Sequence, residues 1–199
     1  MKTTITCLII SCFFLAGCAA GPATSPELSS VNRKSETIVH KGSKFVFPAA
    51  VGAFQRSGDL HFFDDTGNNF SASYNIDAPD FRAACTVYVY PATAKDSPEK
   101  TDESILKDHY SEVKAAIMSM YRARLFWDAT YELPRRSQVA KGKKAIFELE
   151  TPEGEIALSH LYIFVHKGRF VKYRFTYPSE ANEAVRPELE KFLELFQWP

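Results

Sequence analysis

The histidines are the side chains of this sequence that could hold a metal ion or move a proton, so their spacing decides which chemistry is available. His160 and His166 lie six residues apart in an expected strand. They share one face of it, but at about 3.3 Å per residue they are roughly 20 Å apart and do not bind one metal ion. His40, His61 and His109 belong to no Cys-x-x-Cys, His-Glu-x-x-His or EF-hand pattern. The sequence therefore predicts no metal site and no cofactor.

Nucleophilic catalysis would need an activated serine or cysteine. The sequence has no Gly-x-Ser-x-Gly elbow, and Cys85 lies in an expected strand, which favours a buried structural thiol over a reactive one. The tract Asp64-Asp65-Thr66-Gly67-Asn68-Asn69 lacks the alternating oxygen ligands of a calcium loop and predicts a hairpin turn. No catalytic and no cofactor-binding residue is predicted.

One specific motif lies near the N-terminus, Leu15-Ala16-Gly17-Cys18. It follows Lys2 and an apolar run from Ile5 to Ala16, which is shorter than the roughly 20 residues that a membrane-spanning helix needs. These residues resemble the lipobox of bacterial lipoproteins. The resemblance implies that residues 1–17 are a signal peptide and that Cys18 becomes the lipidated N-terminus. A plain secretory signal is the alternative.

Lipidation would make the bilayer a partner of the chain through acylated Cys18. One acyl chain binds a membrane marginally, at about 0.8 kcal/mol per buried methylene, whereas two or three chains hold firmly. Ala19 stands where the family's inner-membrane signal has Asp, which implies the outer membrane, facing the periplasm. Residues 18–42 are rich in small and polar residues and predict a flexible tether, and residues 43–199 are expected to form a single domain.

The overall composition is that of a globular protein. The chain has 199 residues, 45% of them hydrophobic, which is enough for one domain with a real core. Its 24 basic residues balance 24 acidic ones, which argues against nucleic acid as a partner. Of the four cysteines, Cys7 and Cys12 would leave with the signal peptide and Cys18 would be acylated, so Cys85 has no disulfide partner.

Two groups of basic residues could contact anionic lipid headgroups or glycan. One is the stretch Arg135, Arg136, Lys141, Lys143 and Lys144, and the other lies in the last strand, where Lys172 and Arg174 share a face near Arg169. The alternative is an ordinary solvated surface balanced by nearby glutamates. The 16 phenylalanines could line an apolar cleft, but they favour a hydrophobic core.

Periodicity of apolar residues predicts the elements that would position these side chains. A hairpin is expected from Phe54–Phe63 and Phe70–Ile76, followed by a central strand, Ala84–Tyr90, covered on both faces. A helix capped by Ser97 should present a stripe that includes Leu106, Tyr110, Val113, Ile117 and Met120. A meander follows, with strands over Ala129–Gln138, Lys144–Glu150, Glu155–His166 and Arg169–Tyr177. The chain should close with a second helix, whose inward residues are Val185, Leu189, Phe192, Leu193 and Phe196.

These elements predict an α+β fold, an antiparallel sheet with two amphipathic helices packed on it. The order of elements begins with a Phe-rich hairpin, continues with a Tyr-Val-Tyr strand before a long helix, and closes with a helix that ends Glu194-Leu195-Phe196. This order is similar to that of the photosystem II extrinsic subunit P and the DcrB-like envelope lipoproteins. The resemblance spans about residues 44–197 and implies a PsbP-like sandwich with an accessory or binding role. It transfers no functional residue.

The function expected from these features is that of a membrane-anchored envelope lipoprotein acting as a non-enzymatic binding or assembly factor. Its partner would be an envelope protein or an apolar ligand. An envelope hydrolase and a structural envelope protein are the alternatives. An open cluster of His61, His109 or His160 with an acidic residue would favour the hydrolase.

Radioactive palmitate supplied to cells should label the wild-type chain, because acylation places the lipid on Cys18. The label should be lost in Cys18→Ala. A label that persists in this variant would contradict the lipoprotein prediction.

Overall fold

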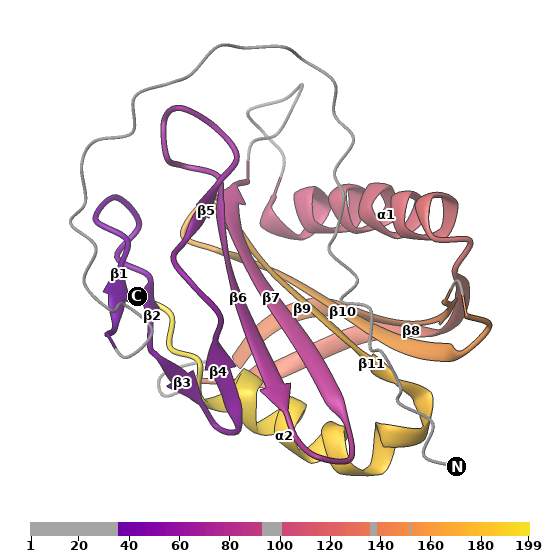
Figure 1. The fold of residues 1–199 in the computed structure, drawn as a ribbon. Coiled ribbons are helices and arrows are strands. Elements are labelled where there is room, and N and C mark those ends of the chain that lie inside the picture. The colour runs from indigo at the N-terminus through magenta and orange to yellow at the C-terminus, as the bar shows by residue number, and fades with distance from the viewer. Residues whose placement is uncertain (1–35, 93–100, 136–138, 152) are drawn as a thin grey trace. The chain divides into compact units, whose positions relative to one another are not determined.

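The computed structural model of the chain describes residues 36–92, 101–135, 139–151 and 153–199. Within them, nine strands form one antiparallel sheet in the order β3-β4-β6-β7-β11-β10-β9-β8, with β5 also paired to β6, and β1 and β2 form a separate two-stranded sheet (Figure 1). The elements are β1 Ile38–Val39, β2 Val46–Phe47, β3 Ala50–Val51, β4 Phe54–Arg56, β5 His61–Phe62, β6 Phe70–Asp77, β7 Arg82–Pro91, α1 Asp102–Met120, β8 Arg124–Pro134, β9 Val139–Glu150, β10 Ile156–His166, β11 Arg169–Pro178, a 3-10 turn at Ser179–Ala181 and α2 Asn182–Leu195.

Alternation along the long strands gives the sheet two different faces. On β11, Val171, Tyr173 and Phe175 are fully buried, whereas Lys172 and Arg174 between them are half-buried. Because successive side chains of a strand point to opposite faces, these two sets lie on opposite sides of the sheet. The two helices also lie on opposite sides, each over its own apolar core (Figure 1). The predicted α+β class, a mostly antiparallel sheet with two helices, is confirmed.

The larger core lies under α2. The apolar residues predicted for this helix are all buried, and Phe192 meets the rings of Phe54 and Phe175 edge to face, at 5.2 and 5.5 Å between centroids. The NH1 group of Arg135 donates to the carbonyls of Leu193 and Phe196, at 3.1 and 2.8 Å. These bonds satisfy carbonyl groups that the end of a helix leaves without an intrahelical partner.

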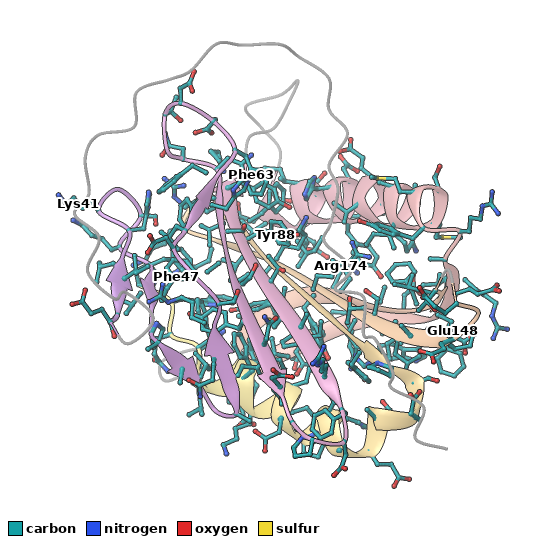
Figure 2. The ribbon with its side chains drawn as sticks, in the orientation of Figure 1. Lys41, Phe47, Phe63, Tyr88, Glu148 and Arg174 are labelled. Carbon is teal, nitrogen blue, oxygen red and sulfur yellow. The ribbon has the colours of Figure 1, made fainter. Side chains whose placement is uncertain are left out.

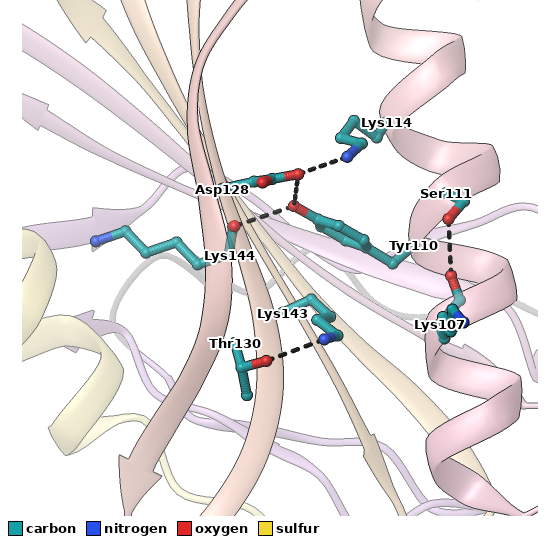
Figure 3. A network of polar contacts seen from close by, with 8 residues as sticks. All are labelled: Lys107, Tyr110, Ser111, Lys114, Asp128, Thr130, Lys143 and Lys144. Carbon is teal, nitrogen blue, oxygen red and sulfur yellow. Dashed lines mark hydrogen bonds and ion pairs between the residues drawn. The ribbon is translucent and has the colours of Figure 1, made fainter.

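α1 is held over β8 and β9 by polar contacts as well as by its own core. The Tyr110 hydroxyl donates to the Lys144 carbonyl at 3.0 Å and lies 3.5 Å from Asp128 Oδ2, which pairs with Lys114 (Figure 3). The helix begins at Asp102, where the Thr101 hydroxyl accepts from the Ser104 amide, and the predicted cap at Ser97 lies outside the described residues. These contacts fix α1 over one side of the sheet only.

The apolar stripe predicted for α1 is confirmed at Leu106, Tyr110 and Ile117 but wrong at Met120, whose side chain is 64% exposed. Met120 is the last residue of the helix, which leads into β8 at Arg124, and its side chain lies outside the core that buries Ile117 one turn earlier. None of the helices in the described residues is long and apolar enough to cross a membrane.

The predicted meander is confirmed, although β8 begins at Arg124 instead of Ala129 and β9 at Val139 instead of Lys144. The predicted hairpin is also confirmed, because β4 and β5 both pair with β6. In its turn, Asp64 Oδ1 accepts from the Thr66 hydroxyl and the Asn68 amide. Strand pairing begins at Ile38, which pairs with Phe47, inside the segment predicted as a tether.

Gly142 gives a test of this packing. It lies in β9 opposite Phe164, and a Cβ atom there would meet the Phe164 ring at 2.4 Å and the Ile163 carbonyl oxygen at 2.7 Å. We expect Gly142→Ala to lower the free energy of unfolding by about 1–3 kcal/mol, measured by urea denaturation. Gly58→Ala, which adds a methyl group to open space, is the control and should change it little. Equal midpoints for the two variants would contradict the packing described.

Candidate functional site

A large part of the sheet face that carries α1 is left open by the helix. α1 packs against β9 and β10, whereas β7 and β11 run beside it. On β7, Cys85 is buried in the core of the other face, and Thr86, Tyr88 and Tyr90 remain half-buried. The prediction that this strand is covered on both faces therefore holds for the face of Cys85 and only in part for the other, where Tyr90 packs against the core under α1.

Lys172 and Arg174 lie on this same face. They occupy alternate positions of β11, and the register places them opposite Tyr88 and Thr86 of β7. Tyr88 and Arg174 are seen on the side of the sheet toward α1 (Figure 2). We call this surface, formed by Thr86, Tyr88, Tyr90, Lys172 and Arg174, the open face.

Aromatic rings hold both cations in place. Lys172 Nζ lies 4.0 Å from the centroid of the Tyr88 ring and 5.7 Å from that of Tyr90. The guanidinium carbon of Arg174 lies 4.3 Å from the centroid of Tyr121, and its Nε donates to the Ser159 hydroxyl at 3.2 Å. Such cation–π contacts orient a charge but leave its hydrogen-bond donors available to other groups.

Neither cation has a carboxylate partner among the residues that the structure describes. Among the described residues, the ion pairs of Arg82, Lys114, Arg124 and Arg186 each use an aspartate or glutamate, and none includes Lys172 or Arg174. Burial lowers the pKa of the Lys172 ammonium to about 8, and the nearby charge of Arg174 acts in the same direction. The site therefore concentrates positive charge that the fold does not neutralise.

Further aromatic groups border the open face. Phe63 stacks on Tyr88, with centroids 6.2 Å apart, and the Tyr90 hydroxyl is 2.6 Å from His109 Nε2. His109 stacks on Phe170 at 4.1 Å, and its Nδ1 lies 3.7 Å from a carboxylate oxygen of Glu112. Both ring nitrogens of His109 are thus engaged with neighbours in the fold.

The three histidines considered for catalysis lie apart. His61 is exposed on β5 beside Phe63, and His109 lies on the α1 face. His160 is 4% exposed on the α2 face, 2.7 Å from the Tyr177 hydroxyl, and burial lowers its pKa to about 3. Across the described ranges, no group of three or more His, Cys, Asp or Glu side chains is arranged to hold a metal ion.

The basic stretch near residue 140 is dispersed by the fold. Arg135 lies against α2, and Lys143 donates to the Thr130 hydroxyl at 3.0 Å. Lys144 lies on the α2 side of the sheet, with its ammonium over the rings of Trp127, Tyr131 and Tyr162. Arg136 lies outside the described residues. In β11, Arg169 donates to the carbonyl and side-chain oxygens of Asn68, both at 3.1 Å.

Sequence reasoning found Lys172 and Arg174 but missed Tyr88, Tyr121 and Ser159 beside them. The sequence does contain an indication of Tyr88. Thr86, Tyr88 and Tyr90 occupy alternate positions and all carry hydroxyl groups, which suit a partly exposed face of a strand. Tyr121 and Ser159 come from distant segments and meet Arg174 only through the fold.

Comparisons with known proteins report only the fold. No family model matches the chain, and no curated protein matches it. The structure is similar to that of a protein of unknown function from Pseudomonas aeruginosa, with a TM-score of 0.51, 8% identity, and coverage of 82% of this chain and 96% of the other. At this identity the likeness extends to the fold alone.

Two further solved structures resemble the chain at lower scores. Cyanobacterial PsbP from Synechocystis has a TM-score of 0.47 and 11% identity, covering 87% of this chain and 98% of its own. The Ran-binding protein Mog1p from Saccharomyces cerevisiae has a TM-score of 0.44 and 11% identity, covering 81% and 91%.

Replacing Lys172 should stabilise the domain. The lowered pKa means that burial destabilises the charged lysine in the folded chain by about 3 kcal/mol. The cation–π contact with Tyr88 offsets about 1 kcal/mol of this destabilisation. We expect Lys172→Met to raise the free energy of unfolding at pH 7 by about 1–2 kcal/mol, measured by urea denaturation.

The pH dependence of that gain follows from the two pKa values of Lys172. Below pH 8 the lysine is charged in both the folded and the unfolded chain, so the buried charge lowers the free energy of unfolding of the wild type by its full amount. Between pH 8 and 10.5 the folded chain releases its proton first, and the advantage of Met shrinks. Lys41→Met, in an exposed turn, is the control. A gain of equal size at pH 7 and pH 9.5 would contradict the burial of this charge.

Proposed function

We propose that the chain is a lipid-anchored, non-enzymatic binding or assembly factor of the bacterial envelope, and that it binds through the open face. The anchor is Cys18 of the lipobox-like Leu15-Ala16-Gly17-Cys18, with the folded domain held at the outer membrane on its periplasmic side. The binding surface is built from residues of β7 and β11, which are far from Cys18 in the sequence.

The observation that carries this proposal is the pair Lys172 and Arg174, held over aromatic rings without an acidic partner. A half-buried charge without a counterion costs stability, and such a cost is typical of functional positions. A ligand or protein that brings negative charge to this face would offset the cost on binding.

We further propose that the sheet and its helices form the PsbP-like sandwich implied by the order of elements in the sequence. Two observations support it. α1 and α2 cover opposite faces of the sheet, and each face has its own apolar core. In such an arrangement, the part of one face that a helix leaves uncovered is the natural place for a ligand.

The hydrolase alternative would depend on His109, which lies between Tyr90 and Glu112 at the border of the open face. A general base needs a ring nitrogen that can accept a proton from the reacting group. Here Nε2 already meets the Tyr90 hydroxyl at 2.6 Å, and the ring is stacked on Phe170. These contacts favour a structural role for His109 and thus a binding function for the face.

Site-specific photo-crosslinking in the native envelope tests the binding function. A photoreactive amino acid at Ser73, which is exposed beside Thr86, should give a discrete adduct identifiable by mass spectrometry. The same amino acid at Glu183, exposed on α2, is the matched control and should give none. The adduct from position 73 should disappear in Arg174→Met. Adducts of equal yield from both positions, or hydrolysis of envelope material by the purified chain, would overturn the proposal.

A further inference from the structure

Lys172 and Arg174 have donors that no described residue uses. Within the part of the chain that the structure describes, Lys172 Nζ makes no hydrogen bond, and Arg174 uses only Nε, toward Ser159. Both side chains are partly exposed, and neither is among the described residues with a fully buried nitrogen that lacks a partner. The site thus combines charge with unused donors on a partly exposed face.

Lys172 and Arg174 suit an oxyanion by the kind of donor that each presents. They occupy alternate positions of β11, so both side chains leave the same face of the strand. Phosphate and carboxylate oxygens accept charge-assisted hydrogen bonds from ammonium and guanidinium groups, and guanidinium presents paired donors to them.

We infer that the open face is a binding site for a small ligand that carries a phosphate-like or carboxylate oxyanion, which Lys172 and Arg174 would bind through the donors that no described residue uses. The inference rests on the proposed function in using the same face, and it adds the chemical class of the ligand.

The charge of the whole chain favours a small anion over an extended polyanion. The sequence carries 24 basic and 24 acidic residues, so it has no net positive charge to attract an extended polyanion over a distance. The two unpaired cations are instead local and partly desolvated, where a direct contact with an anion is strong. A compact dianion would match both of them at once.

Titration of the full chain in neutral detergent with pyrophosphate tests this inference, with isothermal calorimetry for affinity and NMR of 13C-labelled lysine for position. Saturable binding is expected with a dissociation constant below about 1 mM, and the Lys172 side-chain signal should move. Lys172→Met and Arg174→Met should each weaken binding at least about tenfold.

Two variants separate the site from general charge effects. Lys172→Arg keeps the cation and should stay within about threefold of wild type, whereas Lys41→Met removes a charge far from the open face and should leave affinity unchanged (Figure 2). With sulfate as the probe, which keeps its charge between pH 7 and 9, affinity should fall with rising pH in the wild type but not in Lys172→Arg. Urea unfolding of every variant shows that each is folded.

The absence of saturable pyrophosphate binding, or an equal loss of affinity in Lys41→Met, overturns the inference. Binding to phosphatidylglycerol vesicles without any binding of pyrophosphate also overturns it, since the ligand would then be a lipid surface. If crosslinking from Ser73 persists while pyrophosphate fails to bind, the oxyanion inference falls and the proposed binding function stands. If pyrophosphate binds but no adduct forms from Ser73, the oxyanion inference stands and the proposed binding function in the envelope falls.

Discussion

The side chains of β7 and β11 point alternately to the two faces of one sheet, and the rest of the domain depends on how these faces are filled. On one side, Cys85 and Phe175 are fully buried in the core under α2. The same register places Tyr88 and Lys172 side by side on the other face. A shift of one residue would put Lys172 into the apolar core, so the burial of one face fixes the position of the polar groups on the other.

Comparison with Arg135 shows why the cations of the open face are functional candidates. Arg135 is also half-buried and also lies on an aromatic ring, that of Trp198, at 4.1 Å. Its NH1 group, however, donates to two carbonyls at the end of α2, so its charge contributes directly to the fold. Lys172 makes no comparable bond, and Arg174 makes one, to Ser159. The fold therefore uses Arg135 and leaves most of the donors of the other two available.

The sequence predicted those parts of the fold that are set by local pattern. The meander, the Phe-rich hairpin and the inward face of α2 follow from alternation and helical spacing, and each is confirmed. The extent of α1 over the sheet was not predictable, because it depends on long-range contacts such as Tyr110 with Asp128 and the Lys144 carbonyl. The sequence likewise could not show that α1 covers only part of β7. Tyrosine counts as apolar in a periodicity argument, although its hydroxyl group suits a partly exposed surface.

The candidate site shows a similar division between local and long-range information. The shared face of Lys172 and Arg174 follows from their spacing alone, but their lack of partners does not. Arg169, three residues before Lys172, finds an acceptor in Asn68, which is a hundred residues away in sequence. Only the folded chain distinguishes the satisfied cation from the unsatisfied ones. Balanced total charge then gives this local pair its specificity, since long-range attraction of anions by the domain is weak. In the proposed function, selection would therefore come from direct contact between an oxyanion of the ligand and these two cations.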